Sequence, residues 1–270
     1  MKLQDKVVLV TAATRGIGLA VVTACAKEGA VVYMAARNEE RARKAAEPLV
    51  SAGLHVRSVY NDANVPDSFT TMVEDVVALE GHIDVLVNNF GTSDPTRDLD
   101  FIHTDPGAFL ATVTLNLRSV FLGSQAAARH MARQGSGSII NISSVGGIVP
   151  DISQVSYGTS KAAINYLTKL IAVQEAKNGI RCNAVLPGMT ATDAVEEKLT
   201  PDFKSRFLRH VPLGRMAEPR EIADAVVYFA SDSSAYTTGQ ILTVSGGFGL
   251  ATPLYGDLVH ETNSRGSVQS

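Results

Sequence analysis

Short apolar runs alternate with longer amphipathic segments along most of the 270-residue chain. The apolar runs are rich in β-branched residues and almost continuous in apolarity, as is typical of strands buried on both faces. Strand–helix alternation of this kind predicts a parallel sheet covered by helices on both faces. The predicted strands are residues 7–10, 31–35, 56–60, 85–87, 138–142, 182–186 and 241–244, and the predicted helices are 17–28, 39–51, 67–79, 106–134, 156–177 and 221–231.

No repeat, linker or low-complexity segment divides this pattern. A chain of 270 residues is within the range of one α/β domain. The sequence therefore predicts a single α/β domain, residues 1–270, with a doubly wound parallel sheet of seven strands. The polar tail 263–270 is expected to be frayed.

Composition excludes several classes of function. The formal net charge is −3 and no Lys/Arg-rich run occurs, which argues against nucleic-acid binding. Cys25 and Cys182 lack metal-ligand spacing and are expected to be buried free thiols, which fits a reducing, cytoplasmic setting without a metal site. No apolar stretch is long enough for a signal region or a bilayer span, so no membrane association is expected.

Tyr157 and Lys161 are the first candidates for chemistry. On a helix, side chains at positions i and i+4 share one face, which places an ammonium beside a phenol. A nearby positive charge lowers the pKa of a phenol from about 10, so the pair could transfer a proton to or from an alcohol near neutral pH. Alone, the same spacing also fits an exposed lysine beside a packing tyrosine.

A glycine-containing turn, residues 11–18, joins the first predicted strand to the first predicted helix. Glycines there allow close approach of a pyrophosphate, and the helix N-terminus offers free N–H groups. The alternative is an ordinary strand–helix turn. The second strand ends without the carboxylate that bonds a ribose in many nucleotide-binding sheets, and Arg37 follows at once. Together with Arg15, this favours NADP over NAD, unless both arginines are solvated surface charges.

Polar residues also follow the third, fourth and fifth strands, at the edge where such sheets bind ligands. Asp62 could accept a bond from an adenine amino group, and Asn88 and Gly91 could shape the backbone beside a ribose. Each is otherwise an ordinary turn residue. Ser143 and Ser144 lie on opposite sides of the fifth strand, so only one should face the site.

Several motifs occur in a characteristic order and spacing: residues 11–18, 88–91, Asn116, Ser144, Tyr157 with Lys161, and 187–188. By these motifs the whole chain resembles the short-chain dehydrogenase/reductases. The resemblance implies a Rossmann-type fold, with Tyr157 as general acid–base and Lys161 lowering its pKa and binding the nicotinamide ribose. It also implies that Ser144 orients the reacting oxygen and that Ser143 has a structural role. Asn116 would bind a water molecule that links Lys161 to solvent for proton exchange. The implied cofactor residues are Thr11, Thr14, Arg15, Gly16, Ile17, Gly18, Arg37, Asp62, Ala63, Asn89, Gly91, Tyr157, Lys161, Pro187, Gly188, Thr190 and Thr192.

Two positions depart from the family pattern. Ala12 replaces the first glycine of the loop, where its methyl group is expected to tighten the turn slightly without abolishing binding. Phe90 replaces a family alanine and is expected to add an apolar face to the substrate pocket.

Residues 194–199 and 203–209 alternate apolar and charged side chains at helical spacing, which predicts an amphipathic lid at about 189–214. Two surface helices packed on the body are the alternative. Loop stretches and a C-terminal extension from about residue 248 further resemble the NADP-dependent 7α-hydroxysteroid dehydrogenases of gut clostridia. The implied substrate residues are Phe90, Thr92, Ser144, Ile148, Gln154, Met189 and Val195.

The expected activity is reversible, NADP-dependent oxidation of a bile-acid hydroxyl, foremost at the 7α position. A 12α- or 3α-hydroxysteroid dehydrogenase, or a reductase of 3-oxoacyl thioesters or other apolar ketones, would use the same chemistry. A non-catalytic cofactor-binding regulator should have lost Tyr157 or Lys161, and both are present. The family resemblance also implies a homotetramer.

Overall fold

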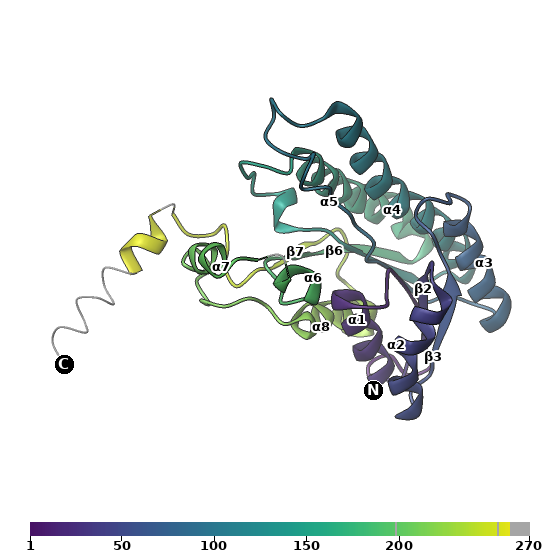
Figure 1. Ribbon diagram of the computed structural model, residues 1–270. Helices are drawn as coiled ribbons and strands as arrows, with labels where there is room; N and C mark the ends of the chain where they lie inside the picture. The colour runs from purple at the N-terminus through teal and green to yellow at the C-terminus, as the bar shows by residue number, and fades with distance from the viewer. Residues whose placement is uncertain (198, 253, 260–270) are drawn as a thin grey trace, which may run out of the picture.

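A parallel sheet of seven strands in the order β3-β2-β1-β4-β5-β6-β7 forms the centre of the molecule (Figure 1). The computed structural model describes residues 1–197, 199–252 and 254–259. Strand order reverses between β1 and β4, the position where doubly wound sheets bind ligands at the carboxyl ends of their strands. The predicted fold class is confirmed. The strands are β1 (Val7–Thr11), β2 (Val31–Ala36), β3 (Val56–Tyr60), β4 (Val85–Asn88), β5 (Gly137–Ile142), β6 (Ile180–Pro187) and β7 (Ile241–Val244).

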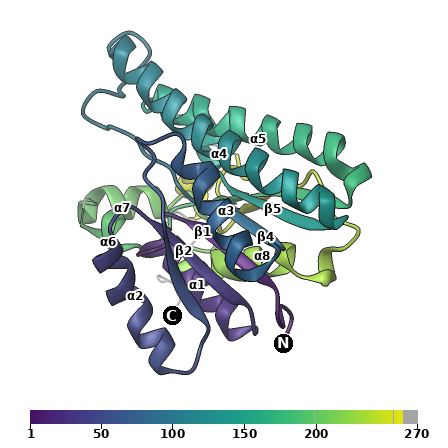
Figure 2. The same ribbon diagram turned by 90° about the vertical axis from the view of Figure 1, so that its right-hand side faces the viewer.

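Two layers of helices cover the sheet, as Figure 2 shows. Alternate residues of β1 supply the two cores, because successive strand side chains point to opposite faces: Val8 and Val10 pack in one core, and Val7 and Leu9 in the other. One layer holds α1 (Gly16–Lys27), α2 (Glu39–Ser51) and α8 (Pro219–Ala230), and the other holds α3 (Ser68–Glu80), α4 (Pro106–Gln134) and α5 (Val155–Glu175).

Every predicted strand and helix is present, and the differences lie at element ends. Helix α8 begins at Pro219 rather than at residue 221, because Glu218 and Glu221 form a capping box around a proline suited to the first turn. Helix α5 ends at Glu175, and a 3-10 turn, Ala176–Asn178, completes the segment predicted as helix.

The predicted lid contains two short helices, α6 (Asp193–Glu196) and α7 (Pro201–Leu208). The C-terminal segment runs beside α7 and away from the sheet (Figure 1). The rings of Phe207 and Phe248 stack with centroids 4.8 Å apart, and Arg209 pairs with Asp257 at 2.8 Å. These contacts join α7 to the C-terminal segment. The tail 263–270, expected to be frayed, lies outside the described residues.

Within the described ranges, none of the helices combines the length and apolarity needed to span a bilayer. Cys25 and Cys182 are buried free thiols, as predicted. Burial raises the pKa of the Cys25 thiol to about 12 and that of Cys182 still further, which leaves both unreactive near neutral pH.

Candidate active site

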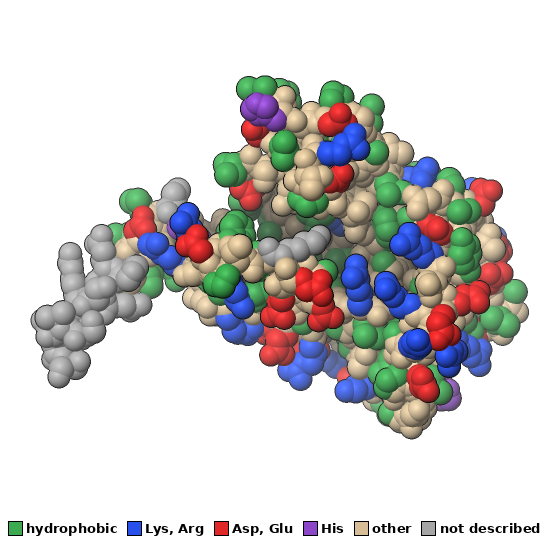
Figure 3. All heavy atoms as spheres, in the orientation of Figure 1, with side chains coloured by type: hydrophobic (Ala, Val, Ile, Leu, Met, Phe, Trp, Pro, Cys, Tyr) green, Lys and Arg blue, Asp and Glu red, His purple; other side chains and the backbone are tan. Residues whose placement is uncertain are grey.

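Two cavities open at the carboxyl edge of the sheet. The glycine-loop cavity, of about 550 Å³, lies among the turn after β1, the ends of β2, β3 and β4, and residues 192–194. The lid cavity, of about 860 Å³, lies among residues 144–155, the first turns of α5, α7 and Phe248. The face seen in Figure 3 is hollowed near its middle, and Lys and Arg side chains gather beside the hollow.

The turn after β1 needs glycine at two positions for different reasons. Gly16 has φ of +53°, in the left-handed region that L-residues rarely adopt. At Gly18, a Cβ would lie 2.6 Å from both the Ala12 carbonyl oxygen and the Asn89 Nδ2. Asn89 in turn donates from Nδ2 to the carbonyls of Thr11 and Ala12, each at 3.1 Å, and so fixes the loop against β4.

Ala12 does more than tighten the turn. It adopts φ of +51°, so the family's glycine is replaced by a residue held in a left-handed backbone conformation. Such a conformation costs an L-residue about 1–2 kcal/mol. Its carbonyl is held by Asn89, which keeps the strained turn in place.

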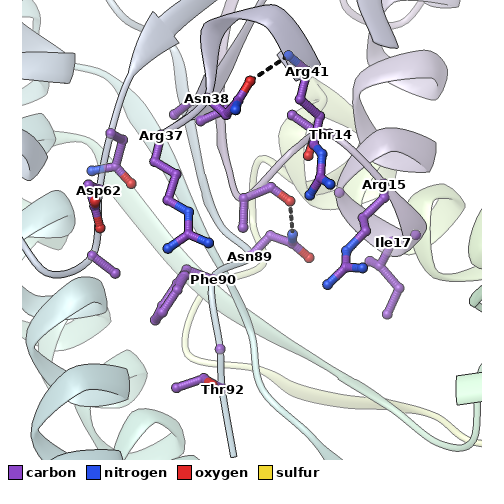
Figure 4. Close-up of a pocket in the computed structure, with 18 of the residues that line it drawn as sticks. Thr14, Arg15, Ile17, Arg37, Asn38, Arg41, Asp62, Asn89, Phe90 and Thr92 are labelled. Atoms are coloured by element: carbon purple, nitrogen blue, oxygen red, sulfur yellow. Dashed lines mark hydrogen bonds between the residues drawn. The ribbon is translucent and has the colours of Figure 1, made fainter. Parts of the chain in front are cut away.

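Three guanidinium groups line one end of the glycine-loop cavity. Figure 4 shows Arg15, Arg37 and Arg41 directed toward the same space, with Asp62 also on its border. None of the three forms an ion pair with any described residue. This cluster suits an anion with several oxygens, such as a phosphate.

The sequence-based prediction did not include Arg41, although the sequence contains a helix-capping pattern that indicates its position. Asn38 caps α2, and its Oδ1 accepts a bond from the Arg41 backbone N–H at 2.8 Å. A capping asparagine at the end of the second strand therefore places the third residue of α2 at the same edge as Arg37.

The other end of this cavity is formed by the segment after β4. The backbone N–H groups of Asn89 and Phe90 donate to the buried Thr11 hydroxyl, at 2.9 and 3.1 Å, so Thr11 supports the site from behind. Phe90 and Thr92 line the glycine-loop cavity, and their predicted contact with the substrate stays a prediction. Thr192 lies beside the loop, since a Cβ on Gly16 would be 3.2 Å from its methyl carbon.

Tyr157, Lys161 and Ser144 come together between the two cavities. The Lys161 Nζ lies 5.6 Å from the Tyr157 ring centroid, as expected of neighbours on one face of α5. A Cβ on Gly91 would lie 2.9 Å from the same nitrogen, which places the β4 segment beside the lysine. Ser144 and Tyr157 both line the lid cavity.

The two ionisable groups differ from the sequence-based prediction. Burial raises the pKa of the Tyr157 phenol above its usual value, and the neighbouring Ser144 hydroxyl only partly opposes this. The Lys161 ammonium donates to the Ile142 carbonyl at 2.9 Å, and burial lowers its pKa to about 8. The pKa of Tyr157 is therefore raised rather than lowered, because desolvation outweighs the Ser144 hydrogen bond. A lowering of this pKa by Lys161 stays a prediction.

The serine pair divides as its alternation predicts. The Ser143 hydroxyl is buried and donates to the Lys161 carbonyl at 3.2 Å. The Ser144 Oγ accepts a bond from the Gly146 N–H at 3.1 Å. The Ser144 hydroxyl also hydrogen-bonds the Tyr157 phenol and lowers its pKa, so the two hydroxyls face the same part of the lid cavity.

Asn116 is fully buried in α4 and holds the segment after β4. Its Oδ1 accepts from the Thr92 N–H, and its Nδ2 donates to the Thr92 carbonyl and to Ser160, at 2.9, 2.9 and 3.0 Å. Both amide hydrogens are thus occupied by protein partners. The water suggested at Asn116 remains a prediction.

Asp98 is a further residue that the sequence analysis missed. It is 1% exposed, and its two carboxylate oxygens accept bonds from the backbone N–H groups of Ser156 and Tyr157, at 2.8 and 3.0 Å. It therefore caps α5 from a distant loop, because the residue before the helix, Gln154, has φ of +63° and provides no side-chain cap. No local pattern signals a cap 58 residues away in sequence.

The remaining predicted residues fall into three groups. Ser144, Ile148 and Gln154 line the lid cavity, whereas Met189 and Val195 line neither cavity. Pro187, Gly188 and Thr190 also line neither. Pro187 ends β6, and in the turn that follows the Thr190 hydroxyl donates to the Gly188 carbonyl at 3.0 Å. The predicted cofactor residues that border the glycine-loop cavity are Thr14, Arg15, Gly16, Ile17, Gly18, Arg37, Asp62, Ala63, Asn89, Gly91 and Thr192.

Comparisons with known proteins agree with this arrangement. The sequence model of a family described as enoyl-(acyl carrier protein) reductase matches residues 11–249. The 7alpha-hydroxysteroid dehydrogenase of Clostridium sardiniense is 48% identical over 256 residues, covering 95% of this chain and 98% of that protein. The protein of the same name from Paraclostridium sordellii is 47% identical over 259 residues, covering 96% and 97%.

Among solved structures, a 7α-hydroxysteroid dehydrogenase complexed with NADH and 7-oxo glycochenodeoxycholic acid superimposes with a TM-score of 0.86. It is 30% identical, and the match covers 92% of this chain and 95% of that one.

Proposed function

The chain belongs to the short-chain dehydrogenase/reductase family, and we propose that it is an NADP-dependent hydroxysteroid dehydrogenase that reversibly oxidises the 7α-hydroxyl of a bile acid. The observation that carries this proposal is the meeting of Tyr157, Ser144 and Lys161 at the border of a nucleotide-sized cavity and a large, mostly apolar one. The names of the two clostridial relatives described above support the substrate class.

The residues around the glycine-loop cavity fit a dinucleotide. Gly18 allows a close approach that any Cβ would block, and the N-terminus of α1 offers free N–H groups for a pyrophosphate. Arg15, Arg37 and Arg41 all line this cavity, and in this proposal they hold an additional phosphate on the adenosine ribose, which supports NADP over NAD. When bound, NADP would supply the hydride acceptor for oxidation, and NADPH the hydride donor for reduction.

In oxidation, the Tyr157 phenolate takes the proton of the substrate hydroxyl, while the Ser144 O–H donates a hydrogen bond to the same oxygen. Lys161 supplies the charge that favours the phenolate against its burial, since an ammonium with a pKa of about 8 is mostly protonated at neutral pH. In reduction, Tyr157 returns the proton to the carbonyl oxygen. Asn116 and Asp98 hold the segments on either side of this group.

The lid cavity fits a rigid apolar ligand better than a sugar. Its walls include Ile148, Val149, Pro150, Phe207 and Phe248. Its volume is within the range of cavities that enclose a small molecule. A 12α- or 3α-hydroxysteroid, or a 3-oxoacyl thioester, would meet the same catalytic group, so the position of the reacting hydroxyl must be tested directly.

The direct test measures NADPH formation with chenodeoxycholate, deoxycholate and lithocholate, which carry hydroxyls at carbons 3 and 7, 3 and 12, and 3 alone. We expect turnover of chenodeoxycholate only. Turnover of deoxycholate only would mean that the reacting hydroxyl is on carbon 12, and turnover of all three would mean that it is on carbon 3. If none of the three is turned over while NADP still binds, two alternatives remain: a reductase of another apolar ketone, or a non-catalytic regulator. Reduction of acetoacetyl-coenzyme A would distinguish the reductase from the regulator.

The cofactor preference is tested by replacing Arg37 and Arg41 with glutamine. Loss of charge-assisted bonds to a phosphate should lower the ratio of kcat/KM for NADP to that for NAD by roughly 10- to 100-fold. Lys44→Gln is the matched control, because Lys44 lies on the same helix but pairs with Glu40. An unchanged ratio would contradict the assignment of NADP.

By family resemblance, we also propose a cytoplasmic homotetramer. Light scattering of the purified protein would test the assembly, and a monomer would contradict it.

A further inference from the structure

Helix α7 presents one mixed face to the lid cavity. Phe203, Arg206, Phe207 and His210 all line the cavity. Their spacing of i, i+3, i+4 and i+7 is that of side chains on one face of a helix and of the turn that follows it. The lid therefore brings two aromatic rings and two nitrogen-bearing side chains to the cavity together.

The aromatic part of this face continues into the C-terminal segment. The Phe203 and Phe207 ring centroids are 6.4 Å apart, and Phe207 stacks on Phe248 at 4.8 Å. Across the cavity lining, Ile148, Val149 and Pro150 add further apolar surface. A flat hydrocarbon body fits such walls. Arg206 lies where a polar group at one end of the ligand can be bound.

Arg206 retains capacity for another acceptor. Its Nε and Nη2 contact the Asp202 carboxylate at 3.2 and 3.1 Å, an i, i+4 pair in which both side chains are mostly exposed. Exposed ion pairs of this kind contribute little to stability, so Asp202 does not hold Arg206 firmly. A guanidinium has five N–H donors, so those not directed to Asp202 remain for a ligand.

The α7 side of the lid cavity offers hydrogen-bond donors for an anion. Among the described residues lining it, Asp151 is the one carboxylate, and its Oδ1 already accepts a bond from the Ile152 N–H at 2.7 Å. Arg206 supplies a permanent positive charge, and His210 supplies a ring N–H donor.

We propose that Arg206, assisted by His210, binds the anionic end of an amphipathic substrate, the carboxylate of a free or conjugated bile acid, while the steroid body lies on the aromatic face and its hydroxyl meets Tyr157. This inference rests on the proposed function. It makes α7 the element that distinguishes acidic steroids from neutral ones.

The test compares chenodeoxycholate, its glycine conjugate and its methyl ester, in which the charge is removed but the steroid and its hydroxyls are kept. With saturating NADP, kcat/KM is measured for wild type, Arg206→Gln and His210→Gln. Arg206→Gln should lower kcat/KM for the two anions by roughly 5- to 10-fold, mainly through KM, and change that for the ester less than about 2-fold.

Lys204→Gln is the matched control, because it removes the same charge from α7 at a position that does not line the cavity. It should change none of the three values. Equal loss for ester and anions in Arg206→Gln, or equal loss in the control, would overturn the anion site while leaving the dehydrogenase intact. If wild type turns over none of the three steroids, the proposed function fails and the anion site falls with it.

Discussion

The Tyr157 phenol is the residue whose chemistry the proposed reaction needs most, and it lies among groups that only partly favour its ionisation. Burial raises its pKa, so the phenolate depends on nearby positive charge and on hydrogen bonds from polar neighbours. Because of this dependence, a substitution that removes the Tyr157 hydroxyl tests the proposed reaction more directly than a substitution in the cavity lining.

Tyr157→Phe removes the proton-transferring hydroxyl and keeps the ring that packs beside Lys161. We expect kcat to fall by roughly 10²- to 10⁴-fold, the usual contribution of a positioned acid–base group. The Kd of NADP, measured by fluorescence titration, should stay within about 2-fold of the wild-type value, since the phenol is not part of the arginine cluster. Turnover near the wild-type rate would show that another group moves the proton.

Lys161 gives a prediction for stability against pH. Its folded-state pKa is about 8, below the ordinary value of 10.5, so on raising the pH the folded chain loses this proton before the unfolded chain does. Between those values the unfolded state binds more protons, and the contribution of Lys161 to the free energy of unfolding rises with pH.

The variant Lys161→Met lacks this titration. From pH 7.5 to 9.5, wild type should gain roughly 1 to 2 kcal/mol of unfolding free energy relative to the variant. Urea unfolding at a series of pH values measures the difference. Lys169→Met, at an exposed position of α5, is the control and should show no such trend. A constant difference between wild type and Lys161→Met would contradict the lowered pKa.

At the scale of elements, most of the architecture follows from local patterns. The apolar, β-branched runs predicted all seven strands, because strands buried on both faces must be apolar throughout. Ends such as that of α8 differed because capping decides where a helix begins, and a capping box extends it beyond the apolar periodicity.

Helix α5 shows what a local pattern cannot predict. Its first turn carries Tyr157, and its free N–H groups are bonded by Asp98 from a loop distant in sequence. Asp98→Asn would replace one acceptor oxygen with a donor that repels a backbone N–H and would remove a negative charge from the helix N-terminus. We expect unfolding free energy to fall by about 1–3 kcal/mol.

The same variant should lower kcat while leaving the KM for NADP nearly unchanged, because the loosened turn carries the phenol and not the arginine cluster. Urea unfolding and steady-state kinetics on the folded enzyme measure the two effects. Asp105→Ala, which removes the N-cap of α4, is the control: it should reduce stability without the same loss in kcat. Equal kinetic effects of the two variants would assign Asp98 a merely structural role.

At the scale of the whole molecule, the sheet topology explains why the sequence predicted much of the site. Parallel strands end at one edge, so residues after β1, β2, β3 and β4 had to border a common cavity. Strand order alone does not say which of two adjacent cavities a side chain enters, so the sequence did not place Phe90 and Thr92 in the glycine-loop cavity that they line. The role of Asp98 could not be predicted, because it depends on a contact between residues far apart in sequence, which no local sequence pattern indicates.

The segment 189–214 borders both cavities. Residues 192–194 line the glycine-loop cavity, and Phe203, Arg206, Phe207 and His210 line the lid cavity. A ligand that orders this segment at one cavity reduces the conformational entropy that the second ligand must remove at the other. The two binding equilibria then share a coupling free energy, which is reciprocal by thermodynamic necessity. NADP should lower the Kd of the steroid by the same factor by which the steroid lowers the Kd of NADP, and four calorimetric titrations of Tyr157→Phe would measure both factors without turnover.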